Sequence, residues 1–554
     1  MPLAVVVAAA VLFAVLKLYA VNVVVGDEHL YFNMAVLVNK GLVPYRDFFY
    51  THPPLHLYLA VLAFKPFGYS LALGKALTSG AMLIGGLLVF AIGRRMIGAA
   101  EAAVACAVFL LSFDPLRISS HFTGGNETFA FAMIGLWLAY LDRPLLAGIA
   151  FGLGALVAVY IAPGALAVAL LLWWRSRGAA VRFIVTAAAV ALCGNLIMYL
   201  LAGQDFVSQV YLSQFQKGKE GDLIGYTLYH RLGYIMYENR ILTAGAVAGL
   251  VLLAADIRSH AAGGPLRQRL QGPRGEALLL CVAWFALYWL FYLSITLQHA
   301  YYFLFIMPVF AWLSAYGYVG IGRRIWRAIR PGVPTAAGRR VTGRRSPPGP
   351  GNSRLASLVP AAVAAALTLA NIGVIETLYV PFALNRYGTG VLHYPWQPLH
   401  HLAFVDPLVR GLFWQPQYDP HHPPSGIARY LQHESERITV ADQIYAAVYQ
   451  YSTPDDAIFG EVGFIPLVSS ETGRRVAANL VDTSSYRISY GLSRIEDWIA
   501  AIEADHVRLL VVRDQSLPMR YPQFRDYARR NFQTVARIRD PQAGIFEIMR
   551  RTQG

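Results

Sequence analysis

Charged residues are scarce in this chain, and their scarcity excludes an ordinary soluble domain. Asp, Glu, Lys and Arg make up 14% of the 554 residues, whereas hydrophobic residues make up 56%. Soluble domains usually carry roughly one quarter charged residues. The mean hydropathy is +0.44. We therefore expect a polytopic α-helical membrane protein with one further domain outside the membrane.

Cysteine is also rare, and the common nucleotide-binding loops are missing. Cys106, Cys193 and Cys281 lie in separate apolar segments without CxxC spacing. Buried apolar side chains explain them better than disulfides or metal ligands. The chain contains neither a P-loop nor a dinucleotide-binding fingerprint. These absences exclude a disulfide scaffold and offer no loop to hold a nucleotide.

The net charge of +15 is concentrated in one segment. Residues 321–354 contain nine arginines and no acid, and they are rich in proline and glycine. A basic loop between apolar runs is typical of the cytoplasmic side of a membrane protein. No nucleic-acid-binding motif or interleaved aromatic pattern accompanies the charge, so we expect no nucleic-acid partner.

Long apolar runs predict about 11 transmembrane helices, the first of them retained rather than cleaved as a signal peptide. The runs are 2–25, 72–93, 99–113, 127–141, 144–160, 161–174, 183–202, 241–256, 277–297, 301–320 and 357–380. With the N-terminus in the cytoplasm, nearly all basic clusters fall on the cytoplasmic side. The opposite loops are close to charge balance: 26–71, 114–126, 203–240 and 298–300.

The chain divides into a membrane module, residues 1–380, and an extracytoplasmic α/β domain, residues 381–554. In the second part, 457–468 and 507–514 have the pattern of strands, and 493–505 has the pattern of an amphipathic helix. Histidine pairs at 400–401 and 421–422 lack a zinc-site spacing, and we interpret them as surface loop residues.

The first outer loop carries the most informative pattern. Asp27 and Glu28 directly follow the first apolar run, where two adjacent acids are costly unless they have a partner or a task. Residues 29–41 have the spacing of an interfacial amphipathic helix that ends at Gly41. We expect a poorly solvated carboxylate at Asp27, with Asp47 and His52 returning towards it.

A second outer loop ends at Glu127, which lies in the first turn of an expected helix. Helix capping and a functional role are equally good interpretations of this acid. Residues 203–240 are rich in tyrosine and suit either a lid over an acceptor groove or an interfacial anchor. Cations near the outer surface are either snorkelling side chains or phosphate ligands: Arg46, Lys65, Arg231, Arg240 and His299.

At this point a family resemblance becomes specific. The acids Asp27–Glu28, the following helix, YRDFF at 45–49 and HPPL at 52–55 together resemble the first-loop signature of GT-C membrane glycosyltransferases. The pattern is most similar to protein O-mannosyltransferases, aminoarabinose transferases acting on lipid A, and bacterial dolichyl-phosphate-mannose-transferase-like proteins. The segments 469–480 and 509–514 of the C-terminal part also resemble the bacterial group.

The resemblance implies a GT-C fold and a hexosyl or pentosyl transferase in the cell membrane. The donor would be a sugar on a polyprenyl phosphate, and the acceptor a lipid, a protein or a polysaccharide outside the cytoplasm. Asp27 matches the acid that activates the acceptor, Glu28 its neighbour, and His52 the HPP element; Glu127 matches the second-loop acid. His299 with two following tyrosines replaces the Arg-Tyr pair that the family often has.

The residues support the same chemistry independently. Displacement at an anomeric carbon needs a base for the acceptor and cations for the departing phosphate. Asp27 suits the base, and a single carboxylate favours inversion. Glu28, Asp47, His52 and Glu127 would position the acceptor or hold an optional divalent cation; the sequence assigns no other cofactor.

Two rival functions remain open from the sequence. A transporter or flippase of lipid-linked sugars would place charges or helix breaks near the middle of paired spans. The acids here gather at one surface instead. A binding module without catalysis would leave cellular glycolipids and glycoproteins unchanged when Asp27 is replaced by Asn.

Overall fold

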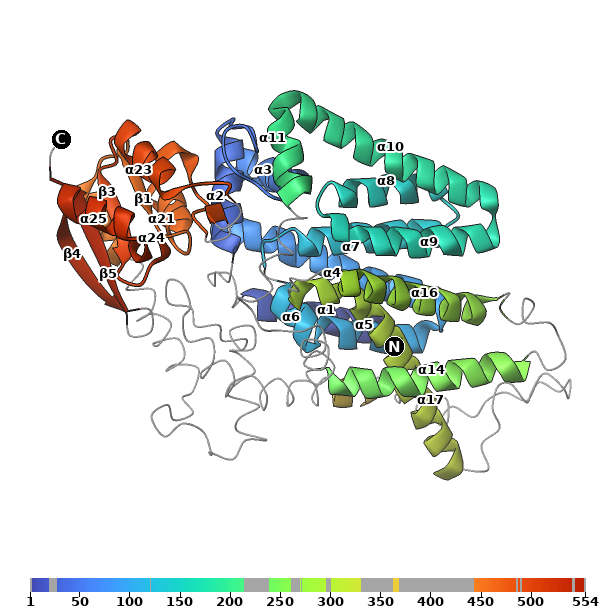
Figure 1. Cartoon of the computed structure of the whole chain (residues 1–554). Helices are drawn as coiled ribbons and strands as arrows, with labels where there is room; N and C mark the ends of the chain where they lie inside the picture. The colour runs from blue at the N-terminus through green and yellow to red at the C-terminus, as the bar shows by residue number, and fades with distance from the viewer. Residues whose placement is uncertain are drawn as a thin grey trace, which may run out of the picture.

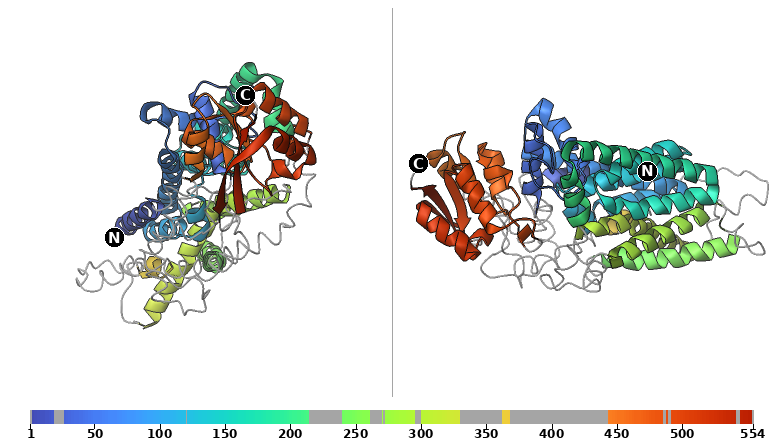
Figure 2. Two further views of the ribbon diagram at one scale, coloured as in Figure 1. Left: turned by 90° about the vertical axis from the view of Figure 1, so that its left-hand side faces the viewer. Right: turned by 45° about the horizontal axis from the view of Figure 1, so that its top comes forward.

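The structure is a computed structural model of the chain. It describes residues 2–18, 27–119, 121–213, 239–260, 270, 272–294, 300–329, 362–367, 443–484, 487–488, 491–540 and 544–552. Figure 1 shows a bundle of long helices with an α/β domain beyond one of its ends. Helices α2 and α3 lie between the two parts, and the two further views in Figure 2 show the same arrangement.

Among the described residues, five helices are long and apolar enough to cross a membrane. They are α4 (Leu71–Met96), α10 (Arg177–Ala202), α14 (Arg240–His260), α16 (Pro273–Ser294) and α17 (Met307–Ile329), which follows the 3-10 segment η4 (Ala300–Ile306). Shorter helices complete the bundle: α1 (Pro2–Leu18), α5 (Ala99–Leu110), α7 (Gly125–Tyr140), α8 (Pro144–Ala155), and α9 (Ala162–Arg175) after η1 (Val159–Ile161). The chain is therefore a multi-pass helical membrane protein, as the sequence predicts.

The helices match the expected apolar runs closely. Each run contains described helix, although of 357–380 only 362–367 lies within the described part of the chain. The loop 203–240 contributes α11 (Gln204–Val207) and a π-helical turn, η2 (Ser208–Leu212); its residues 214–238 lie outside the described part. The boundary between residues 380 and 381 also lies outside it and stays a prediction.

Packing within the bundle relies on small residues and on buried aromatic side chains. Helices α14 and α17 come so close that a Cβ added at Gly249 would collide with the Leu313 carbonyl. Close backbone approach through glycine is typical of helix pairs in membranes. The Trp312 indole donates a 2.9 Å hydrogen bond to the Val89 carbonyl, so this buried polar group is satisfied.

The outer face of α10 has the character of a lipid-facing surface. Leu192, Leu196 and Leu200 follow one another at helical spacing and are 68%, 56% and 75% exposed. A soluble protein rarely leaves a continuous stripe of large aliphatic side chains uncovered. In a bilayer the same stripe contacts acyl chains, because the helix satisfies its own backbone hydrogen bonds.

The C-terminal domain contains a five-stranded mixed sheet in the order β2-β1-β3-β5-β4. Strand β1 runs parallel to β2 and β3, and β5 runs antiparallel to β3 and β4. The strands are β1 (Ala457–Gly460), β2 (Arg475–Val476), β3 (Leu509–Arg513), β4 (Phe532–Asp540) and β5 (Gly544–Arg551). The helical elements are 443–451, α21 (Ile465–Thr472), η8 (Ala477–Asn479), α23 (Ile495–Ala504), α24 (Leu517–Arg520) and α25 (Pro522–Asn531).

One expected strand is wrong in its second half. The apolar segment 457–468 forms strand β1 only to Gly460, and α21 begins at Ile465. Pro466 lies in the first turn of α21, where its missing N–H costs no hydrogen bond. Both halves are buried, so the apolar run had no alternating pattern that would separate a strand from a buried helix. The other expected elements, β3 and α23, are confirmed.

The first outer loop folds into two helices, α2 (Glu28–Asn39) and α3 (Leu55–Phe67). Gly41 adopts φ +94°, and the Leu42 N–H bonds to the Leu37 carbonyl, so the expected glycine stop of α2 is confirmed. Helix α2 packs against both α3 and α21. It therefore lies between the bundle and the α/β domain rather than on an open membrane surface.

Candidate functional site

Glu28 of α2 forms a buried ion pair with Lys75 of α4. Lys75 Nζ lies 2.6 Å from Glu28 Oε1 and 2.5 Å from Oε2, and the two side chains are 0% and 2% exposed. The Phe122 N–H donates a further 2.7 Å hydrogen bond to Oε1. The structure therefore places Glu28, expected beside Asp27 in catalysis, inside the framework that joins α2, α4 and the loop before α7.

Asp27 lies immediately before α2 and is exposed. Its carbonyl accepts a 3.0 Å hydrogen bond from the Leu30 N–H, which begins the helix. The expectation of a poorly solvated carboxylate at this position is wrong. Successive helical side chains are rotated by about 100°, so Glu28 turns into the protein while Asp27 remains on its surface. An incoming acceptor can therefore reach the Asp27 carboxylate from outside.

Aromatic and histidine rings gather beside the first turn of α2. The Tyr31 ring lies 5.8 Å from the His52 ring, 5.8 Å from the His56 ring and 6.1 Å from the Tyr50 ring, measured between centroids. The Tyr45 hydroxyl donates a 2.7 Å hydrogen bond to the His52 carbonyl and holds this part of the loop in place. The structure thus brings His52 to Tyr31 of α2; its expected approach to Asp27 stays a prediction.

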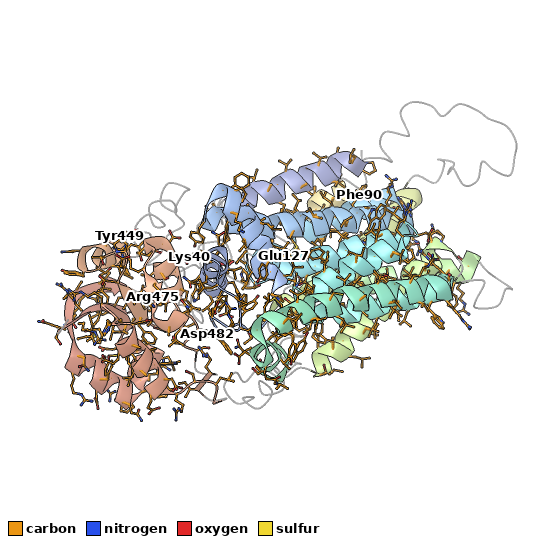
Figure 3. All side chains as sticks on the ribbon, turned by 90° about the horizontal axis from the view of Figure 1, so that it is seen from above. Lys40, Phe90, Glu127, Tyr449, Arg475 and Asp482 are labelled. Atoms are coloured by element: carbon orange, nitrogen blue, oxygen red, sulfur yellow. The ribbon has the colours of Figure 1, made fainter. Side chains whose placement is uncertain are left out.

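Glu127 lies close to this group of rings. Its Oε2 is 3.8 Å from His56 Nδ1, and the two side chains are 9% and 2% exposed. Burial raises the pKa of the Tyr50 hydroxyl, and the Glu127 carboxylate raises it further. In Figure 3, Glu127 lies at the end of the bundle near the α/β domain, and Phe90 of α4 lies towards the other end. We name Tyr31, Tyr50, His52, His56 and Glu127 the ring-and-acid cluster.

Arg46 and Asp47 form a separate pair on the surface. Arg46 Nε and Nη2 lie 2.8 Å and 2.9 Å from the two Asp47 oxygens. This hydrogen-bonded pairing lowers the pKa of the Asp47 carboxyl, which also accepts a hydrogen bond from the Val43 N–H. Asn479 of the α/β domain donates to the Asp47 carbonyl at 3.2 Å. Asp47 therefore shapes the loop and contacts the α/β domain.

The expected phosphate ligands are less well placed or lie outside the described residues. Lys65 is exposed, nine residues after His56 in α3, which corresponds to roughly 13 Å along the helix. Arg240 is the first residue of α14, but its side chain is not among the described ones. Arg231 and His299 lie outside the described part of the chain. Their assignment stays a prediction.

The α/β domain is bound directly to α2. His29 Nε2 lies 2.7 Å from the Val462 carbonyl. One helical turn later, the Asn33 amide donates to the Pro466 carbonyl and to the Ser470 hydroxyl, each at 3.0 Å. Apolar side chains of α2, α3, α21 and β1 form one continuous core around these bonds. The domain therefore helps to hold the helix that begins beside Asp27.

The sequence does not single out three residues of this site: Lys75, His56 and Tyr50. A lone lysine within the apolar run 72–93 is a detectable signal, because an intramembrane charge needs a partner. His56 interrupts the apolar segment that follows Pro54 in the same way. Tyr50 carries no comparable signal, since tyrosine is common in interfacial loops.

The expected optional cation finds no ligand group among the described residues. In that part of the chain, no three His, Cys, Asp or Glu side chains converge in a way that could hold a metal ion. Glu28 is bonded to Lys75 and Asp47 to Arg46, so neither carboxylate is directed at Glu127. We therefore derive no step that passes through a metal.

No family model matches the chain. A curated relative, the catalytic subunit of GPI alpha-1,4-mannosyltransferase I from Danio rerio, is 30% identical over 198 residues. The match covers 34% of this chain and 50% of that protein, so the chain spans half the length of this relative.

Two solved structures share the architecture over nearly the whole chain. ArnT from Cupriavidus metallidurans bound to undecaprenyl phosphate has a TM-score of 0.60 at 13% identity, covering 100% of this chain and 98% of ArnT. The apo state of the same protein gives a TM-score of 0.55 at 16% identity, covering 97% of both chains. The chain therefore has the fold of ArnT, which is the GT-C fold that the sequence predicts.

Proposed function

We propose that this protein is a membrane glycosyltransferase that moves a sugar from a polyprenyl-phosphate carrier to an acceptor at the extracytoplasmic face of the cell membrane. The observation that carries the proposal is the exposed Asp27 at the start of a helix that a buried ion pair holds in place. The fold supports it, because ArnT binds undecaprenyl phosphate and has the same architecture. The relative with mannosyltransferase activity supports the reaction class.

The reaction needs a base for the acceptor, and Asp27 is the base. Its carboxylate takes the proton from the acceptor hydroxyl or amine as the acceptor atom bonds to the anomeric carbon. The bond from that carbon to the phosphate oxygen breaks, and polyprenyl phosphate leaves with the electron pair. Direct attack by the acceptor, with no covalent enzyme intermediate, inverts the anomeric configuration.

The buried pair supplies the precision that this step requires. Glu28 binds both Lys75 and the Phe122 N–H, so the first turn of α2 is tied to α4 and to the loop before α7. A displacement of about 1 Å in a reacting group can cost about 100-fold in rate. We therefore assign Glu28 and Lys75 positioning roles, and we leave acceptor and donor contacts to the ring-and-acid cluster.

The departing phosphate requires cations. The chain leaves α10 at Ala202 and enters α14 at Arg240, and the proposal places this connection at the outer end of the bundle. We assign donor-phosphate binding to Arg231, Arg240 and His299. Arg46 is committed to Asp47, and Lys65 lies further along α3, so both are weaker choices.

The proposal places the α/β domain outside the cytoplasm and the N-terminus inside. In support, Arg94 and Arg95 lie in the last turn of α4, whereas Lys75, in the second turn of the same helix, contacts Glu28 beside the domain. Arg175 ends α9 and Arg177 begins α10. Basic residues thus gather at the end of the bundle away from the domain, as the positive-inside rule requires for a cytoplasmic face.

The test is direct. Purified protein is incubated with defined polyprenyl-phosphate sugars, and the released polyprenyl phosphate and the glycosylated acceptor are identified. We expect the unaltered protein to release polyprenyl phosphate and Asp27→Asn to release none. The variant should elute from size-exclusion chromatography and melt as the unaltered protein does, which shows that it is folded. Movement of the lipid-linked sugar across vesicles without release would favour a flippase, and unaltered release by Asp27→Asn would refute the assignment of the base.

A further inference from the structure

His56 and Glu127 face each other inside the protein with unused hydrogen-bonding atoms. His56 Nδ1 and Glu127 Oε2 lie 3.8 Å apart, which is too long for a hydrogen bond. Within the described part of the chain, the geometry gives no hydrogen-bond partner to either ring nitrogen of His56 or to Glu127 Oε2. The two residues are 2% and 8% exposed. Buried polar atoms of this kind are nearly always satisfied, so the pair has the character of a site for a polar group.

The surroundings of the pair are aromatic. The Phe122 ring lies 4.3 Å from the His56 ring, and the Tyr31 ring lies 5.8 Å from it on an edge-to-face approach. Tyr50 and His52 add two more rings beside Tyr31, with their centroids 5.9 Å apart. A few convergent polar atoms within an apolar, aromatic wall are typical of sites for small neutral ligands. A sugar ring matches this lining, because it has apolar C–H faces and hydroxyl groups at its edge.

We propose that His56 and Glu127 form a subsite that binds one hydroxyl group of the donor's sugar ring. The inference rests on the proposed function and adds the residues that recognise the sugar. The hydroxyl donates its proton to Glu127 Oε2 and accepts a hydrogen bond from the Nδ1–H of neutral His56. One oxygen can lie about 2.8 Å from two atoms that are 3.8 Å apart, so a single hydroxyl bridges the pair.

The position of the pair favours the donor sugar over the acceptor. Asp27 is exposed and receives the acceptor from outside, whereas His56 and Glu127 are buried within the helices that begin behind it. Tyr31 follows Asp27 by about one turn of α2, and its ring lies 5.8 Å from the His56 ring, so α2 connects the exposed acid to the buried pair. A sugar ring beside Tyr31 would present its anomeric carbon towards Asp27 and a hydroxyl towards Glu127.

The experiment measures how the loss of one sugar hydroxyl couples to the loss of His56. Polyprenyl-phosphate donors that each lack a single hydroxyl are compared with the parent donor by polyprenyl phosphate release, first with the unaltered protein. We expect one deoxy donor to lose about 10- to 100-fold in kcat/KM, the range of a hydrogen bond to a charged group. The penalty for the same deoxy donor should be smaller in His56→Gln than in the unaltered protein, because the bond from His56 Nδ1 is already missing there while the bond to Glu127 remains.

Two further variants keep the test decisive. In Glu127→Gln the loss of kcat/KM should shrink for the same deoxy donor as in His56→Gln, because both residues bind the same hydroxyl group. His506→Gln, at an exposed histidine of the α/β domain, should retain the full deoxy penalty. The subsite would be overturned if polyprenyl phosphate is released but His56→Gln and Glu127→Gln lose as much kcat/KM with every deoxy donor as the unaltered protein does. The proposed glycosyltransferase activity would survive that result. Absence of release from every donor by the unaltered protein would overturn both.

Discussion

The buried pair between Glu28 and Lys75 allows a sharp test of the framework around Asp27. Replacing Lys75 by Met keeps the length and the apolar stem of the side chain and removes the ammonium group. Glu28, 0% exposed, would then keep its buried negative charge and lose the ammonium group that lies 2.5 Å from its Oε2. Removing one partner of a buried pair costs about 3–5 kcal/mol, so Lys75→Met should lower the free energy of unfolding by that amount.

A second substitution should recover most of the loss. In Lys75→Met/Glu28→Gln the buried charge is gone, and the Gln carbonyl can still accept the Phe122 N–H. Replacing a whole buried pair by neutral groups is often close to neutral, so the double variant should regain more than half of the lost stability. Lys65→Met, at an exposed lysine of α3, is the matched control and should change stability by less than about 0.5 kcal/mol.

Unfolding in mixed micelles titrated with sodium dodecyl sulfate, followed by tryptophan fluorescence, measures these differences. Trp284 and Trp312 report on the core because both are 1% exposed in the bundle. The reasoning would be refuted if Lys75→Met unfolded within 1 kcal/mol of the unaltered protein, or if the double variant were less stable than Lys75→Met.

Two further predictions concern other parts of the molecule. Gly249→Ala should destabilise the α14–α17 contact by about 1–3 kcal/mol, because the new Cβ meets the Leu313 carbonyl. The control is Gly80→Ala in α4, where a new Cβ meets no atom within 4 Å. It should leave stability unchanged or raise it in the same micelle titration. The hydrogen bond from the Tyr527 hydroxyl lowers the pKa of Glu503 in the folded protein. The ionised Glu503 therefore stabilises the fold at pH values above its pKa in the unfolded chain, about 4.3, and this stabilisation is lost as the pH falls through its lower pKa in the folded protein. Glu503→Gln should therefore make the melting temperature fall slightly less steeply with decreasing pH below about 4, an effect of well under 1 kcal/mol at this exposed site. An unchanged pH dependence would contradict the stabilising role of ionised Glu503.

Patterns that depend on neighbouring residues alone were predictable. Apolar runs located the bundle helices, because a bilayer demands about 20 apolar residues per crossing whatever the rest of the chain does. The glycine stop of α2 was predictable for a similar reason, since few other residues adopt φ +94°. The segment 457–468 shows the limit of this reasoning, because burial on all sides removes the alternation that distinguishes a strand from a helix.

Contacts between distant segments were not predictable. Glu28 and Asp27 are neighbours with the same charge, yet one is buried against Lys75 and the other is exposed. The difference arises from the direction in which each side chain leaves the start of α2. The sequence offered Lys75 as a signal, an isolated charge in an apolar run, but nothing in the sequence says which acid it meets.

The sequence by itself determined that this protein crosses a membrane many times and that acids and histidines gather after the first apolar run, and it predicts that the basic loops share one side. These properties follow from hydropathy and charge, which act on each segment separately. Only the tertiary structure decided which of these residues form a site. It placed His56 3.8 Å from Glu127 and joined Asn33 to the α/β domain, because those pairings depend on how helices far apart in the chain pack together.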